Sequence, residues 1–285
     1  MGLKNSYPLA KKSIDNPHTI VEVNGIKIGG KDLAIIAGPC AVESEEQLFT
    51  IGAFLAEKGI KILRGGAYKP RTSPYSFQGL KEDGLKLLKS VAQKHDMAII
   101  TEVMDLSLLD TVYPYTDILQ IGARNMKNYH FLKELGKTDK PILLKRGMDA
   151  TLEEWLLVAE YILMGGNKQV ILCERGIRTF DHTTRNTMDI AAIPLIKHLS
   201  HLPIIADPSQ ATGNRDIVNS MALAAIAAGA DGLMIEVHNN PEAALSDGPQ
   251  SLRFDQFSDL LNKLKLMGTL NGKEIPDFQL KTQFN

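Results

Sequence analysis

The chain has 285 residues, of which 44% are hydrophobic and 23% are charged, and its formal net charge is −1. Such values are typical of a globular protein, and a nearly neutral charge gives no general attraction to nucleic acid or to an anionic membrane. No stretch approaches the roughly 20 apolar residues of a membrane span, and the first residues contain no apolar core of a secretory signal. The two cysteines, Cys40 and Cys173, fit a reducing compartment, so we expect a cytoplasmic protein.

The first predicted unit comprises residues 1–30, an arm followed by a hairpin. Residues 1–17 are polar and are expected to form a loose arm. The segment T-I-V-E-V-N-G-I-K-I then alternates apolar and polar residues around Asn24-Gly25, which is typical of a β-hairpin with a tight turn. We expect this hairpin to act as a small lid or plug.

From residue 33 onward, short apolar strands alternate with helical patterns. The strands are continuous apolar runs, as in a parallel sheet covered by helices, and they are expected at residues 33–37, 60–63, 97–101, 118–121, 142–144, 169–172, 203–206 and 232–235. Eight such strands predict a (β/α)8 barrel, a TIM barrel, over residues 31–272, followed by a tail at residues 273–285. A doubly wound open sheet is less well supported, because the first turn, G-P-C-A-V-E-S, is no dinucleotide fingerprint.

Local signals support the helices between these strands. Ser44 with Gln47 and Thr151 with Glu154 have the spacing of capping boxes, in which each side chain satisfies the other residue's backbone N–H. Residues 254–267 carry an amphipathic pattern typical of a helix on the outside of the barrel.

The stretch I-L-R-G-G-A-Y-K-P-R-T-S-P-Y-S-F, residues 62–77, begins as a buried strand and ends as a loop with three cations, Arg64, Lys69 and Arg71. Its two glycines allow close backbone approach and its two prolines stiffen the loop. Cations and hydroxyls on a rigid loop at the end of a strand suit an oxyanion such as phosphate or carboxylate. The plainer alternative is a solvated basic loop.

Barrel enzymes collect their active residues at the carboxyl ends of the strands. Reading off those ends gives acidic, thiol and polar candidates, Cys40, Glu102, Asp207 with Gln210, and Glu236 with His238, and five cations, Arg64, Lys69, Arg124, Lys145 and Arg175. Five converging cations would leave uncompensated positive charge unless an anion binds. This convergence predicts a ligand with several negative charges.

A thiol and two carboxylates form a second constellation: Cys40, Glu236 and Asp247. With one more ligand they could hold a divalent transition metal. Spacing alone does not decide this, because a cysteine at the end of a strand is more commonly part of the core.

Several segments, in order along residues 20–270, resemble type I-beta 3-deoxy-D-arabino-heptulosonate 7-phosphate (DAHP) synthases. They are I-A-G-P-C-A-V-E-S, R-G-G-A-Y-K-P-R-T-S-P-Y-S-F-Q-G-L, I-G-A-R-N-M, L-L-K-R-G, C-E-R-G-I-R-T-F, A-D-P-S-Q-A-T-G and M-I-E-V-H-N-N-P-E-A-A-L-S-D-G-P-Q-S-L. The resemblance implies a (β/α)8 barrel, a homo-oligomer (dimer or tetramer) and a divalent metal such as Mn, Co, Zn or Fe. It also implies condensation of phosphoenolpyruvate with erythrose 4-phosphate, the first step of the shikimate pathway to aromatic amino acids.

The same resemblance implies roles for individual residues. Phosphoenolpyruvate would be bound by Arg64, Lys69, Arg124, Lys145 and Arg175. Erythrose 4-phosphate would be bound through its phosphate by Arg71, Thr72 and Ser73. The metal would be held by Cys40, Gln210, Glu236 and Asp247, and the catalytic residues would be Lys69, Glu102 and Cys40.

One position departs from the family pattern. Where the family has the histidine of D-P-S-H as fourth metal ligand, this chain has Gln210. An amide oxygen is a neutral hard donor, weaker than imidazole for borderline metals, so metal affinity and activity could be reduced. His238, two residues beyond Glu236, is expected to support the site rather than to bind the metal.

Two alternatives stay open. The related 3-deoxy-D-manno-octulosonate 8-phosphate synthases take arabinose 5-phosphate and carry an Asn-Arg-Ser-Ser type segment in the corresponding loop, whereas this chain reads K-P-R-T-S. A degenerate barrel that binds phosphorylated metabolites without turnover is favoured only by Gln210, and the intact set of cations argues against it.

Overall fold

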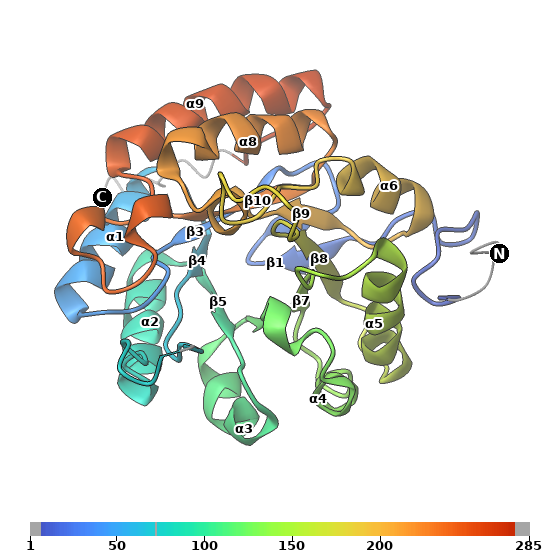
Figure 1. Ribbon diagram of the computed structural model, residues 1–285, viewed down its shortest axis with the longest axis horizontal. Helices are drawn as coiled ribbons and strands as arrows, with labels where there is room; N and C mark the ends of the chain where they lie inside the picture. Colours follow the sequence, from blue (N-terminus) through green and yellow to red (C-terminus); the bar gives the residue numbers. More distant parts are fainter. Residues whose placement is uncertain (1–6, 72, 277–285) are drawn as a thin grey trace, which may run out of the picture.

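The computed structural model describes residues 7–71 and 73–276 of the chain. In this part of the chain, eight parallel strands close into a barrel in the order β10-β3-β4-β5-β6-β7-β8-β9 (Figure 1). The strands are β3 (Ala34–Gly38), β4 (Ile62–Arg64), β5 (Ala98–Glu102), β6 (Ile118–Ile121), β7 (Ile142–Lys145), β8 (Val170–Glu174), β9 (Ile204–Ala206) and β10 (Gly232–Glu236). The predicted (β/α)8 barrel is confirmed, and the alternative of an open sheet is wrong.

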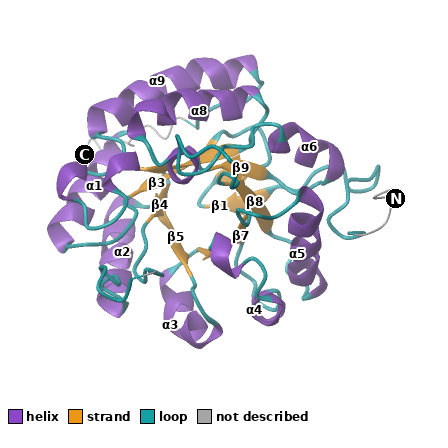
Figure 2. Ribbon diagram, in the orientation of Figure 1, coloured by secondary structure: helices purple, strands orange, loops and turns teal. Residues whose placement is uncertain are grey.

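Helices surround the strands on the outside of the barrel (Figure 2). They are α1 (Glu45–Glu57), α2 (Glu82–His95), α3 (Leu109–Val112), α4 (Tyr129–Leu135), α5 (Leu152–Met164), α6 (Ala192–Leu199), α8 (Arg215–Ala227) and α9 (Phe254–Leu270). A further short helix, α7 (Pro208–Thr212), lies at the carboxyl end of β9. Short 3-10 turns lie at η1 (Leu106–Leu108), η2 (Tyr113–Tyr115), η3 (Ala123–Asn125), η4 (Pro241–Ala243) and η5 (Gly248–Gln250). Among the described residues, no helix is both long enough and apolar enough to cross a membrane.

The two predicted capping boxes have different outcomes. Thr151 and Glu154 form the reciprocal pair at the start of α5, as expected. At α1, Ser44 Oγ accepts from the backbone N–H of Gln47 at 3.1 Å, but the Gln47 side chain accepts from Glu43 instead. The prediction of a reciprocal box at Ser44 was therefore wrong, because the glutamine reaches one residue further back. The single cap still stabilises the helix, typically by about 1 kcal/mol.

The N-terminal hairpin consists of β1 (Val21–Val23) and β2 (Ile26–Ile28), which pair antiparallel. Asn24 and Gly25 have positive φ angles of 48° and 79°, as a two-residue hairpin turn requires. The apolar side chains of both strands pack against the inward-facing residues of the barrel, and Asn24 Nδ2 donates to the carbonyl of Asp96, just before β5, at 2.9 Å. Of the two expected roles, the structure favours a plug, which lies at the amino ends of the strands.

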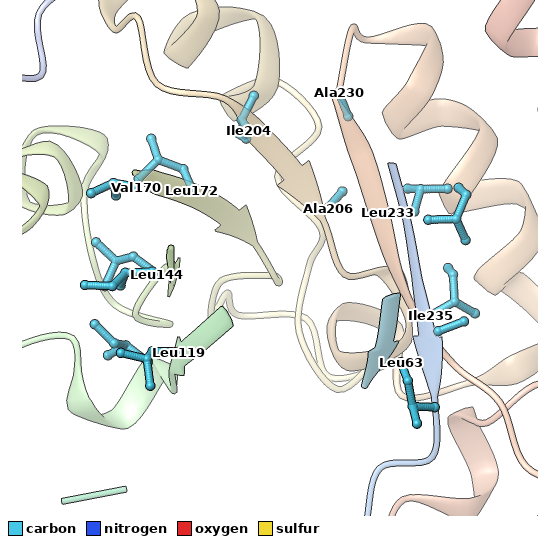
Figure 3. Close-up of a cluster of buried hydrophobic side chains, with 14 of the residues drawn as sticks. Leu63, Leu119, Leu144, Val170, Leu172, Ile204, Ala206, Ala230, Leu233 and Ile235 are labelled. Atoms are coloured by element: carbon cyan, nitrogen blue, oxygen red, sulfur yellow. The ribbon is translucent and has the colours of Figure 1, made fainter. Parts of the chain in front are cut away.

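The main core lies between the strands and the helices. Strand side chains that point outward, among them Leu63, Leu144 and Leu172, are fully buried in it (Figure 3). Burying one such leucine contributes roughly 1.5–3 kcal/mol. Trp155 of α5 is also fully buried, and its indole N–H donates to the carbonyl of Leu144 at 3.3 Å. This layer holds the strands rigidly, so the side chains at their carboxyl ends have fixed positions.

Candidate functional site

A cavity of about 670 Å³ opens at the carboxyl ends of the barrel strands. Eight of the residues that line it are basic: Arg64, Lys69, Arg71, Arg124, Lys145, Arg175, Arg178 and Arg185. Two lining residues, Glu102 and Asp247, are acidic. The five strand-end cations expected from the sequence therefore meet at one cavity, which carries a large excess of positive charge.

Strand alternation explains why the cations point inward. Successive side chains of a strand face opposite sides of the sheet. On β4, Ile62 belongs to the cluster inside the barrel and Leu63 to the outer core, so Arg64 faces the interior again. On β7, Leu143 faces inward and Leu144 outward, and Lys145 therefore enters the cavity.

Arg64 is buried beside the fully buried Glu236, with its Nη1 at 3.1 Å from Oε1. Burial opposes the charge of this guanidinium, but the attraction of Glu236 prevails and raises the pKa of Arg64. Within the part of the chain that the structure describes, neither Nε nor Nη1 of Arg64 makes a hydrogen bond, so the contact with Glu236 is an ion pair without hydrogen-bond alignment. The guanidinium thus keeps unused donors at the wall of the cavity.

Lys145 and Asp207 form a second buried ion pair, with Nζ at 2.6 Å from Oδ2. Burial alone would raise the pKa of Asp207, but Lys145 and then Arg64 outweigh it and lower that pKa. Asp207 Oδ1 also accepts from the backbone N–H of Gln210 at 2.9 Å, which caps the start of α7. Lys145 is therefore held in one position.

Arg175 is buried, and its Nη2 donates to Gln210 Oε1 at 3.2 Å, while its Nη1 has no hydrogen-bond partner among the residues that the structure describes. Burial lowers the pKa of this guanidinium. Within the described part of the chain, Arg175 has no carboxylate within 4.0 Å, and neither do three other lining cations, Lys69, Arg71 and Arg124. Arg175 is buried, Lys69 and Arg71 are half-buried, and Arg124 is exposed. A buried cation without a carboxylate partner is costly, so the surroundings of Arg175 are suited to an anion.

The loop after β4 folds back onto Cys40. Lys69 Nζ donates to the Cys40 carbonyl at 2.9 Å and lies 3.0 Å from the Cys40 sulfur. A side chain at Gly66 would meet the Cys40 carbonyl at 2.8 Å, which explains the glycine there. Arg71 Nε donates to the Phe77 carbonyl at 3.1 Å, and its buried Nη2 has no hydrogen-bond partner among residues 7–71 and 73–276.

Ser73 lines the same cavity as Arg71. Thr72, the third predicted residue of this group, lies outside the described residues.

The predicted thiol and carboxylates come together. The ligand atoms of Cys40, Glu236 and Asp247 all lie within 4.8 Å of one another. Burial raises the pKa of the Cys40 thiol to about 11, with a further contribution from Glu236. Burial would also raise the pKa of Asp247, but Arg185 and hydrogen bonds from Cys40 and Gln210 lower it. A thiol and two carboxylates at this spacing fit a divalent cation, which would also favour the thiolate.

Gln210 lies among these groups. Its Nε2 donates to Glu236 Oε1 at 2.7 Å and to Asp247 Oδ2 at 3.0 Å. Its Oε1 accepts from Arg175. The residue therefore occupies the predicted place, but the amide nitrogen, and not the oxygen, faces the carboxylates. Its role as a metal ligand remains a prediction.

Across the described ranges, His238 makes no hydrogen bond or ion pair with Cys40, Glu236 or Asp247, so its predicted supporting role stays a prediction. Its Nδ1 accepts from the backbone N–H of Asn240 at 3.0 Å, and its Nε2 lies 3.0 Å from Gln47 Nε2 and 3.4 Å from Glu43 Oε2. None of these three residues belongs to the cluster of Cys40, Glu236 and Asp247. We therefore assign it no contact with a bound ligand.

Glu102 ends β5 at the floor of the cavity and accepts from Gln120 Nε2 at 3.4 Å. A side chain at Gly122 would meet Glu102 Oε1 at 2.1 Å, so this glycine makes room for the carboxylate. Arg124 lines the cavity from the following turn, η3.

Several residues of the site were not singled out by sequence reasoning. Gln250 donates to Glu236 Oε2 at 2.6 Å and lies 3.4 Å from Asp247 Oδ2. Arg185 pairs with Asp247 at 3.2 Å, and Arg178 lines the cavity. Gln250 and Arg178 lie in segments that carried the family resemblance, which was a usable signal, whereas Arg185 had none.

A buried ion network also supports Arg175 from behind. Arg146 Nη1 binds Glu174 Oε2 at 2.9 Å and Asp189 Oδ2 at 2.8 Å. Glu174 Oε1 accepts from the backbone N–H of Gly176 at 2.7 Å. Because Glu174 and Gly176 flank Arg175, this network holds the backbone from which Arg175 enters the cavity.

Comparisons with known proteins agree with this arrangement. The family model described as "DAHP synthetase I family" matches residues 12–271. A relative from Thermotoga maritima, named phospho-2-dehydro-3-deoxyheptonate aldolase, is 51% identical over 94% of this chain and 80% of its own length. The crystal structure of a protein of that name from the same organism superposes with a TM-score of 0.92 at 50% identity, covering 95% of this chain and 79% of that one. A 2-dehydro-3-deoxyphosphooctonate aldolase from Desulfosudis oleivorans is 32% identical over 86% of this chain and 94% of its own length.

Proposed function

The chain belongs to the DAHP synthetase I family, and we propose that it condenses phosphoenolpyruvate with erythrose 4-phosphate to give DAHP and inorganic phosphate. This reaction is the first step of the shikimate pathway. The observation that carries the proposal is the cavity itself: four of its lining cations have no carboxylate partner among the described residues, and it is also lined by Asp247 of the cluster with Cys40 and Glu236. Two substrates that together carry two phosphates and one carboxylate would supply the missing negative charge.

Phosphoenolpyruvate is assigned to the part of the cavity where three cations, Arg64, Lys145 and Arg175, are buried. Its carboxylate and phosphate would be bound by Arg64, Lys69, Arg124, Lys145 and Arg175. Unused guanidinium donors on Arg64 and Arg175 support this assignment. Charge-assisted hydrogen bonds are about twice as strong as neutral ones, and the rigid network behind Arg175 reduces the entropy lost on binding.

Erythrose 4-phosphate is assigned to the loop after β4. Its phosphate would bind Arg71, Thr72 and Ser73, and the buried free Nη2 of Arg71 supports this placement. With both phosphates bound at separate points, the two reacting carbons are held together, and such orientation can contribute several kcal/mol to catalysis.

Cys40, Glu236 and Asp247 would hold a divalent metal, with position 210 as the predicted fourth ligand. The metal, when bound, would supply Lewis-acid polarisation of the aldehyde oxygen. Mn, Co, Zn and Fe suit a donor set that combines sulfur and carboxylate oxygen.

The proposed reaction forms one carbon–carbon bond, between C3 of phosphoenolpyruvate and the aldehyde carbon of erythrose 4-phosphate. One water adds at C2 of phosphoenolpyruvate, and the bond from C2 to the phosphate oxygen breaks to release phosphate and leave the C2 ketone. Glu102 faces the cavity and is proposed to carry a proton at the reacting centre, with Lys69 and Cys40 as the other catalytic residues.

The deciding experiment measures loss of phosphoenolpyruvate with erythrose 4-phosphate or arabinose 5-phosphate, after chelation and re-addition of Mn, Co, Zn or Mg. Turnover with erythrose 4-phosphate but not with arabinose 5-phosphate supports the proposal. Turnover with arabinose 5-phosphate would instead indicate the octulosonate reaction named for the Desulfosudis relative. Substrate binding without turnover at any metal would identify a degenerate barrel.

We further propose a cytoplasmic homodimer or homotetramer. Light scattering after gel filtration measures the mass directly against the 31.3 kDa of one chain.

A further inference from the structure

Gln210 joins two parts of the site that bind ligands of opposite charge. Its amide nitrogen donates hydrogen bonds to Glu236 and Asp247, and its amide oxygen accepts one from Arg175. The reversed orientation would place N–H groups against a guanidinium and a carbonyl oxygen against two carboxylates. Because donors and acceptors would then face their own kind, the partners allow only the observed orientation.

This orientation opposes a cation. An amide NH2 group has donors and no lone pair for a metal. A cation that binds Cys40, Glu236 and Asp247 must therefore displace the amide nitrogen from both carboxylates. The hydrogen bond from Arg175 holds the other end of the amide and resists this movement.

Anion binding would remove that resistance. Arg175 is buried and lines the cavity, its Nη1 has no hydrogen-bond partner among the described residues, and its Nη2 donates to Gln210 Oε1. Because a guanidinium binds an oxyanion through two parallel N–H donors, an anion that uses Nη1 together with Nη2 competes with Gln210 Oε1 for Nη2. We propose that Gln210 couples the two sites: an anion on Arg175 releases the amide and strengthens metal binding, and metal binding strengthens anion binding equally. The equality follows from thermodynamic linkage. The inference rests on the proposed function only in using the same metal and anion sites.

The expected size of the coupling follows from the hydrogen bond between Arg175 and Gln210, which the anion replaces. One hydrogen bond to a charged group contributes about 1.5–3 kcal/mol. We expect the coupling free energy between the two sites to lie near the lower of these values. This corresponds to a change of about tenfold in metal affinity. Direct attraction between a bound cation and a bound anion also contributes to the coupling, and this contribution does not depend on Gln210. A control variant must separate it from the contribution of Gln210.

The chain offers a matched control in Gln250. Its Nε2 also donates to Glu236 and lies near Asp247, at 2.6 and 3.4 Å, but its oxygen has no hydrogen-bond partner among the described residues. Gln250 therefore touches the same two carboxylates without the link to Arg175. Gln210→Leu and Gln250→Leu remove the same chemical group at similar side-chain volume.

The test is titration calorimetry of metal-free protein with Mn²⁺, with and without saturating sulfate at constant ionic strength. Sulfate should strengthen Mn²⁺ binding about tenfold in the native protein and in Gln250→Leu, and about twofold or less in Gln210→Leu. Melting curves establish that each variant is folded, and Gln210→His provides a second variant at that position, with the same loss of coupling expected.

Equal coupling in native protein and in both Gln210 variants would overturn the inference, as would loss of coupling in Gln250→Leu alone. Neither result depends on turnover, so failure of the coupling and failure of the proposed reaction are distinguishable. The activity assay described above decides the reaction separately.

Discussion

Replacing Lys145 by methionine should destabilise the protein by about 3–4 kcal/mol at pH 7. The change removes the charge but keeps most of the side-chain volume, and leaves Asp207 fully buried without its partner at 2.6 Å. Removing one partner of a buried ion pair typically costs about 3–5 kcal/mol. Asp207 keeps its hydrogen bond from Gln210 and the attraction of Arg64, so the lower part of that range applies.

Protonation of Asp207 sets an upper limit to the stability that Lys145→Met loses. Asp207 can instead take a proton, and keeping an aspartic acid of ordinary pKa near 3.9 protonated at pH 7 costs about 4 kcal/mol. In the native protein the pKa of Asp207 is lower than in the unfolded chain. The charged carboxylate therefore stabilises the folded state at any pH above the pKa of the unfolded chain, and this stabilisation is lost as the pH falls through the pKa of the folded protein. In Lys145→Met the pKa is raised, so the deficit should shrink by up to about 1.4 kcal/mol per pH unit on acidification from pH 7.

Urea unfolding at pH 5, 6 and 7, followed by circular dichroism and the fluorescence of Trp155, measures this deficit. The double variant Lys145→Met with Asp207→Asn removes both charges and should recover stability to within about 1 kcal/mol of the native protein, without recovering phosphoenolpyruvate affinity. A deficit below about 1 kcal/mol at pH 7, or one that does not change with pH, would refute the reasoning.

Three further outcomes are expected. Arg71→Ala should raise KM for erythrose 4-phosphate through loss of about 2–3 kcal/mol of phosphate binding, with KM for phosphoenolpyruvate nearly constant; equal increases in both would contradict the assignment. Gln210→His should tighten Mn²⁺, Co²⁺ and Zn²⁺ about tenfold or more in calorimetry, and unchanged affinity would remove position 210 from the metal ligands. Glu102→Gln should lower kcat by about 100-fold or more with little change in either KM; a native kcat would show that no proton passes through this carboxylate.

Much of the fold could be predicted because its signals are local. Short apolar runs such as residues 142–144 and 232–235 are typical of a covered parallel sheet, and the Asn24-Gly25 turn permits the positive φ angles that a hairpin needs. Strand ends could be located in the same way. Since barrel enzymes collect their active residues at the carboxyl ends of the strands, the sequence predicted Arg64 and Lys145 at the mouth of the barrel.

The contacts within the site could not be predicted from the chain. Asp207 lies 62 residues from Lys145, and Arg185 lies 62 residues from Asp247. Nothing local distinguishes these partners from other acids and bases, because pairing depends on where closure of the barrel brings distant strand ends together. Arg185 belongs to no motif and was missed for this reason.

The sequence by itself determined the barrel, the hairpin and the kinds of side chain at the carboxyl ends of the strands, because periodicity and turn chemistry act over a few residues. Only the tertiary structure decided that the hairpin plugs the amino end of the barrel and that the Gln210 amide turns its nitrogen to Glu236 and its oxygen to Arg175. The physical reason is that an amide has a donor end and an acceptor end, and its orientation follows from partners that β8 and β10 bring together across the closed barrel.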